Sequence, residues 1–85
     1  MDQTSPAITI TDAAAVGHAI RARRKQDGLT LAETAGLTNV GIRFLSELEN
    51  GKPTVRLDKL LRVVAALGLQ LQLVSTSTPG PSWER

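Results

Sequence analysis

Four side chains between positions 42 and 50 have the chemistry and the spacing to contact DNA bases together. They recur at intervals of three and four residues, which is one face of a helix: Ile42, Arg43, Ser46 and Asn50. A guanidinium such as that of Arg43 can make two parallel hydrogen bonds to guanine, Ile42 can touch a thymine methyl group, and Asn50 can bond a base or a phosphate. Without the surrounding pattern, Arg43 would more often be an ordinary exposed arginine than a base reader. The elements around it must therefore distinguish the two interpretations.

Four neighbouring residues bear on the same chemistry. Gly41 lets the backbone approach a phosphate at the start of this helix, and Lys52 can hold the DNA backbone. Phe44 can pack or contact a base step, and we favour packing. Glu47 either points to the side, which we favour, or accepts a hydrogen bond from cytosine N4.

Two short helices joined by a tight turn must position this face. Thr30 and Glu33 form a capping box, which predicts that a helix begins at Leu31. It ends at Asn39, because asparagine tolerates the left-handed conformation of a helix C-terminus. Gly41 caps the second helix, which stops at residues 50–51.

The apolar residues of these two helices point inward in the same pattern. Leu45 and Leu48 face the interior from the second helix, opposite the candidate contact face, and Ala35 is small where the two helices cross. Two such helices in a helical domain have the form of a helix-turn-helix, whose second helix enters the major groove.

Longer helices are predicted on both sides of this unit. Thr11 caps the first, which runs to about Gln26, and Asp12 favours its dipole. Its inward-facing residues are Ala13, Val16 and Ile20. After Pro53 another helix follows, closed by Gly68, with apolar residues at three- and four-residue intervals: Leu57, Leu60, Leu61, Val64 and Leu67.

Short segments at the two ends alternate between apolar and polar residues, which predicts β-strands. Ile8 to Ile10 is one, and Leu69 to Leu73 is the other, with Leu69, Leu71 and Leu73 on one face. A lone strand needs a partner. The second strand therefore pairs with a second copy of itself in a dimer, with Ile8 to Ile10 in a closed monomer, or with both.

The composition is that of one small helical domain. The chain has 85 residues, 2% aromatic residues, no cysteine and a net charge of +2. A core built from Leu, Val, Ile and Ala favours helices. The lack of cysteine and of an apolar leader or membrane segment leads us to expect an intracellular, cytoplasmic protein that is not associated with a membrane.

One basic run stands out in the first helix. Arg21, Arg23, Arg24 and Lys25 fall within five residues that include no acid, and three of them, Arg21, Arg24 and Lys25, are expected on a face away from the core. Such runs are more commonly a solvated helix face than a nucleic-acid site.

Nothing in the sequence supports an enzyme or a cofactor. Ser46 has no histidine base, and the acidic residues are explained by helix caps or pairs. His18 is the only histidine and has no partner at metal-ligand spacing, so we expect it on the surface and expect no metal site.

Over roughly Val16 to Gly68 the sequence resembles the Xre and phage-repressor family. The stretch from Leu48 to Lys52, LENGK, is similar to the end of the family's recognition helix. The resemblance implies a partly buried structural ion pair between Arg24 and Glu49. It also implies that the start of the helix at Thr30 and Leu31 approaches DNA.

The chain departs from this family at three positions and at its ends. The family often has glutamine where this chain has Leu31, and it usually has larger apolar residues where this chain has Thr34 and Thr38, so we expect weaker packing there. Most simple members also lack the flanking strands.

The strands and the segment RFLSELENGKP resemble the HipB-type antitoxins. That resemblance implies a homodimer joined through an intermolecular sheet, binding to a palindromic operator on double-stranded DNA, repression of its own operon, and neutralisation of a HipA-type kinase toxin. It also implies a bacterial cytoplasmic protein that is associated with the nucleoid when it is bound to DNA.

The expected fold is therefore mainly α, a four-to-five-helix repressor-like helix-turn-helix domain with short flanking strands. We expect a flexible N-terminus at 1–7, a DNA-binding and dimerisation domain at 8–75, and a flexible tail at 76–85. In the tail, Trp83 is either a partner anchor or an incidental residue. Two other functions stay open: a repressor without a toxin, and a protein-interaction module that has lost DNA binding.

Overall fold

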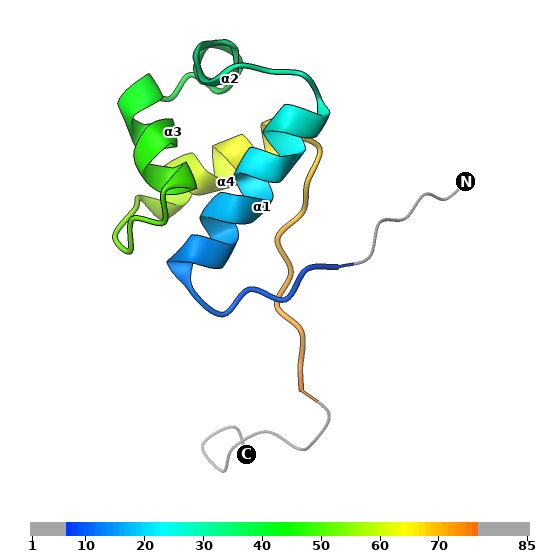
Figure 1. The fold of residues 1–85 in the computed structure, drawn as a ribbon. Helices are drawn as coiled ribbons and strands as arrows, with labels where there is room; N and C mark the ends of the chain where they lie inside the picture. The colour runs from blue at the N-terminus through cyan, green and yellow to red at the C-terminus, as the bar shows by residue number, and fades with distance from the viewer. Residues whose placement is uncertain (1–6, 77–85) are drawn as a thin grey trace, which may run out of the picture.

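The computed structural model describes residues 7–76, and in that range the chain forms four helices (Figure 1). They are α1 (Ala13–Gln26), α2 (Leu31–Thr38), α3 (Ile42–Glu49) and α4 (Leu57–Ala66). The prediction of a mainly helical domain is confirmed, with four helices in the described range. The tail that contains Trp83 lies outside it, apart from Thr76.

The first helix begins one residue later than expected. Asp12, and not Thr11, is the N-cap: its backbone is extended, and its carboxylate oxygen accepts a hydrogen bond of 2.9 Å from the backbone N–H of Ala15. A charged carboxylate at this position satisfies a free N–H and also meets the positive end of the helix dipole.

The turn between α2 and α3 follows the predicted chemistry. Thr30 and Glu33 make both hydrogen bonds of the capping box, at 3.0 and 2.8 Å. Asn39 closes α2 in the left-handed conformation, with φ of 58°. Gly41 is the N-cap of α3 and makes no side-chain hydrogen bond. The helix-turn-helix geometry thus comes from local signals.

The core lies between α1, α3 and α4, and its buried apolar residues are Ile20, Val40, Leu45, Leu48, Leu60, Val63, Val64 and Leu67. The apolar residues that repeat along α4 are not all buried. Leu57 and Leu61 are 61% and 44% exposed, while Val63 is fully buried. The apolar stripe on α4 is wider than the surface that its neighbours cover, so two leucines remain outside.

Thr34 and Thr38 are buried although they are polar. Their side-chain hydroxyls donate to backbone carbonyls one turn earlier in the helix, Thr34 to Thr30 at 3.0 Å and Thr38 to Thr34 at 2.7 Å. Among the described residues no buried side-chain polar atom lacks a partner. These hydrogen bonds remove the desolvation penalty that a buried hydroxyl would otherwise carry.

Neither predicted strand forms within residues 7–76. Ile8 to Ile10 and Leu69 to Leu73 carry no strand assignment, and no backbone hydrogen bond joins them. Both segments instead line one open groove together with α1 and α4. The described range of the single chain therefore does not contain the two-stranded sheet of a closed monomer.

Helix α1 packs directly on the C-terminal end of α3. Gly17 is buried there, and a Cβ atom on it would lie 2.8 Å from the carbonyl oxygen of Glu49 and closer still to that of Leu48. Only glycine allows the two backbones to approach so closely.

About two turns further along α1, a buried ion pair joins the same two helices. Arg24 Nε and Nη2 donate to the two carboxylate oxygens of Glu49 at 2.6 and 2.9 Å, and the side chains are 9% and 6% exposed. Arg24 Nη1 also donates to the carbonyl of Leu29 at 2.7 Å. The hydrogen bond to Glu49 raises the pKa of Arg24 above its usual value. Arg24 is thus buried and does not belong to the exposed basic face on which the helical pattern placed it.

Replacing Gly17 by Ala should destabilise the domain, because the added methyl group meets backbone atoms that cannot move aside. We expect a loss of about 1 to 3 kcal/mol in the free energy of unfolding, measured in urea. Gly36→Ala is the matched control: nothing lies within 4 Å of its added Cβ, so it should stabilise α2 by about 0.5 to 1 kcal/mol. Equal effects at both positions would contradict the close packing.

Removing one partner of the Arg24–Glu49 pair should cost about 3 to 5 kcal/mol, because the other charge stays buried without a partner. The double variant Arg24→Ala/Glu49→Ala should cost less than the sum of the single variants. The exposed pair of Arg56 and Asp58, at 2.6 Å, is the control and should show no measurable coupling. If the effects of the two single variants were additive, Arg24 and Glu49 would have no interaction energy, and the pair would not stabilise the fold.

Candidate nucleic-acid interface

The outer face of α3 presents the side chains that were singled out for base contact. Leu45 and Leu48 are buried, which fixes the opposite face of the helix toward solvent. On that face Ile42 is 50% exposed and the side chain of Arg43 90% exposed. Asn50 is exposed at the end of the helix, and Ser46 is half-buried between them. The structure therefore brings the four residues onto one accessible face.

The charges on this face form a small network. Glu47 forms two ion pairs, from Oε2 to Arg43 Nε at 3.5 Å and from Oε1 to Lys52 Nζ at 3.2 Å. The hydrogen bond from Lys52 lowers the pKa of Glu47, and the positive charge of Arg43 acts in the same direction. Glu47 therefore holds both cations beside the candidate contact face.

The two ends of α3 differ in their hydrogen bonding. At its start Gly41 has no side chain to cap the helix, so the first-turn N–H groups receive no side-chain hydrogen bond from the N-cap. At its end the Asn50 amide nitrogen donates to the carbonyl of Ser46 at 2.8 Å. The amide is thereby held in one orientation, and its oxygen remains an acceptor.

The two residues expected at the start of α2 have different surroundings. Thr30 is exposed, with its hydroxyl oxygen accepting from the N–H of Glu33. Leu31 is half-buried and packs against the core. Packing is thus the visible role of Leu31, and Thr30 is the more accessible of the two.

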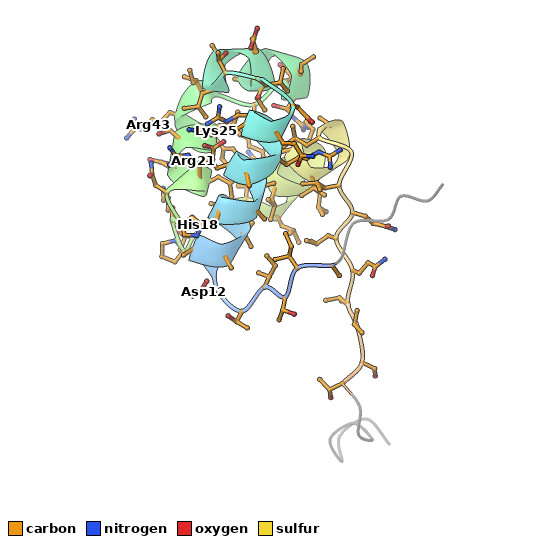
Figure 2. All side chains as sticks on the ribbon, turned by 45° about the vertical axis from the view of Figure 1, so that its right-hand side comes forward. Asp12, His18, Arg21, Lys25 and Arg43 are labelled. Carbon is orange, nitrogen blue, oxygen red and sulfur yellow. The ribbon has the colours of Figure 1, made fainter. Side chains whose placement is uncertain are left out.

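Phe44 packs against the core, as favoured from the sequence, with Lys59 Nζ 5.5 Å from its ring centroid. His18 is exposed on α1, as expected (Figure 2). Within residues 7–76 no group of three His, Cys, Asp or Glu residues is arranged to hold a metal ion. None of the described helices is long and apolar enough to span a membrane.

One contact at the turn was missed from the sequence. Arg62 on α4 donates to the carbonyl of Asn39 at 3.2 Å, which links α4 to the turn between α2 and α3. These residues are far apart in the chain, and neither the helical period nor any motif points from one to the other. Only the packing of α4 brings them together.

The fold of this chain matches solved structures of HipB. It aligns with the HipB structure titled "HipB-O4 20mer complex" with a TM-score of 0.75 over 82% of this chain and 99% of the other, at 21% identity. The structure titled "Structure of HipA-HipB-O2-O3 complex" aligns equally well, with a TM-score of 0.75 and 23% identity over 82% of this chain and 99% of the other. The four-helix arrangement is therefore the fold of HipB.

Two relatives are more similar in sequence. The clp gene regulator ClgR from C. glutamicum is 39% identical, with a TM-score of 0.63 over 69% of this chain and 76% of that one. An uncharacterized HTH-type transcriptional regulator of Sinorhizobium fredii, y4mF, is 38% identical over 60 residues, which are 71% of this chain and 79% of that protein.

The family model described as a helix-turn-helix domain matches residues 15–76, a range that includes all of α2, α3 and α4 and nearly all of α1. With the capped turn, the buried inner face of α3 and these relatives, the match shows that the chain belongs to the helix-turn-helix domain family, as its resemblance to repressors of the Xre type indicated.

Proposed function

We propose that this protein is a sequence-specific DNA-binding transcriptional repressor whose helix α3 enters the major groove. The exposed face of α3 carries the proposal. Arg43 reads guanine, while Ile42 and Asn50 contact neighbouring groups, as their chemistry allows. The family relationship and the likeness to HipB support this proposal.

Phosphate contacts complete the proposed interface. Gly41 and the free N–H groups at the start of α3 face one DNA strand, with Thr30 and Leu31 beside them. Lys52 lies past the other end of α3 and binds a phosphate once it leaves Glu47. Ser46 lies between the base-reading side chains and donates to a base or a phosphate.

We further propose that the chain acts as a homodimer through its C-terminal segment, within a DNA-binding and dimerisation domain at 8–75. Leu71 and Leu73 are 49% and 103% exposed in the single chain, whereas Leu69 packs against the core. Pairing with a second copy covers these leucines and the backbone edge together. Two-fold symmetry then presents two α3 helices to a palindromic operator, with centres about 34 Å apart or a multiple of that.

The proposed biological role is that of an antitoxin that represses its own operon and binds a HipA-type kinase toxin. It is supported by the common fold with HipB, one of whose solved structures is a HipA-HipB-O2-O3 complex. In this role the tail at 76–85 supplies Trp83 as an anchor for the toxin. A repressor without a toxin is the second candidate, since ClgR, named as a clp gene regulator, is more identical in sequence than HipB.

Arg43→Ala should weaken binding to a duplex from the protein's own promoter by about 1 to 3 kcal/mol, because one bidentate base contact is lost. Fluorescence anisotropy measures the affinity, and circular dichroism should show an unchanged fold since Arg43 is exposed. Arg23→Ala is the control, because Arg23 lies on α1 and not on the outer face of α3, and this variant should bind as the parent does. An unchanged affinity for Arg43→Ala would exclude Arg43 as a reader. A parent that binds no duplex even at low salt would instead favour the protein-interaction module.

Leu71→Lys should convert the dimer to a monomer, because it places a charge in the apolar face that the second copy covers. Analytical ultracentrifugation should show the change in mass, and operator affinity should fall by about 100-fold or more as the two recognition helices lose their linkage. Gln72→Lys, which adds the same charge to the other face of the segment, should remain a dimer. A monomeric parent at tens of micromolar, by order of magnitude, would overturn the dimer.

A further inference from the structure

Two cations on α1 have no protein partner in the part of the chain that the structure describes. Within residues 7–76, the other arginines and lysines each meet a carboxylate, a carbonyl or an aromatic ring: Arg23, Arg24, Arg43, Lys52, Arg56, Lys59 and Arg62. Arg21 and Lys25 have no such contact, and both are exposed. The fold therefore leaves two positive charges available to a ligand.

These two residues lie on the side of α1 that adjoins α3. Gly17 and Arg24 contact the end of α3 directly. Arg21 follows Gly17 by four residues and precedes Arg24 by three, so it lies on the same side of α1, and Lys25 is one turn beyond it. Arg21 borders the contact between α1 and α3 but stays outside it.

Figure 2 shows Arg21 and Lys25 on the same side of the molecule as Arg43. Arg43 lies on α3, and the two other cations lie on the adjacent α1. A helix seated in the major groove is flanked by the phosphates of both strands, since the groove is only about 12 Å wide. Cations on a helix beside α3 therefore come next to one of these backbones.

We infer that Arg21 and Lys25 form a second phosphate-binding surface on α1, which binds the DNA backbone beside the groove that α3 occupies. This inference rests on the proposed function and adds to it two contacts that carry no base information. They would bind any duplex, and they would position α1 and, through the Arg24–Glu49 pair, the end of α3.

The four residues of the basic run, 21 and 23–25, thus differ in whether they have a partner among the described residues. Arg24 is buried against Glu49, and Arg23 is paired with Asp27 at 3.4 Å. Of this run, Arg21 and Lys25 have no partner among residues 7–76, and they lie one helical turn apart. The common interpretation as a solvated face predicts no effect of either residue on DNA binding, so the two interpretations can be separated by experiment.

The test measures the salt dependence of binding to a mixed-sequence 20-base-pair duplex by fluorescence anisotropy with the full chain. Neutralising a phosphate contact reduces the slope of log K against log salt by about 0.9. Arg21→Gln and Lys25→Gln should each flatten the slope by about that amount, and the double variant by about 1.8. The ratio of affinities for the promoter duplex and the mixed duplex should stay as in the parent.

Arg23→Gln is the matched control, because it removes the same charge from the opposite side of α1, and it should keep the parent's slope. Thermal unfolding midpoints of the Arg21 and Lys25 variants should equal the parent's, since both side chains are exposed. If the parent binds with a steep slope and the Arg21 and Lys25 variants keep it, the α1 surface is refuted while the proposed function stands. An equal loss in Arg23→Gln would refute it too, by showing an effect of net charge alone. A parent that binds no duplex at low salt would overturn the proposed function itself.

Discussion

The buried ion pair between Arg24 and Glu49 is the interaction on which the candidate interface depends. It joins the last turn of α1 to the last residue of α3 through two hydrogen bonds, while a third goes to the carbonyl of Leu29. Because the donors and the carboxylate have fixed planar geometry, the pair sets orientation as well as distance. With Gly17 allowing backbone contact nearby, it holds α3 so that one face is turned to solvent.

The charges beside the outer face of α3 are exposed and therefore contribute differently from the buried pair. Glu47 lies between Arg43 and Lys52 and pairs with both at the surface, where such contacts contribute little to stability. Their value lies in keeping two cations close to the outer face of α3 in the free protein. A phosphate or a base can replace this carboxylate at little cost, since the pairs are exposed to water. The fold is thus stabilised by one buried pair and leaves its surface charges exchangeable.

The single chain also leaves apolar surface uncovered at its two ends. Ile8, Leu71, Leu73 and Val74 are between 49% and 103% exposed, and the two end segments line one groove without pairing. Soluble domains of this size rarely expose contiguous apolar surface without a partner. In the proposed homodimer a second copy would cover this surface, because each chain offers the same unpaired edge, as a two-fold interface requires.

The sequence by itself determined the helices, the turn and which residues share the outer face of α3. The capping box at Thr30, the left-handed Asn39 and the spacing of Leu45 and Leu48 are local signals, so they can be read without knowing what packs where. The tertiary structure alone decided which cations are available: Arg24 is buried, whereas Arg21, three residues earlier, is exposed. It also decided that two apolar residues of α4 stay outside and that the end segments do not pair within one chain. Burial and strand pairing depend on neighbours that are distant in sequence. Helical periodicity carries no information about how much of a helix those neighbours cover.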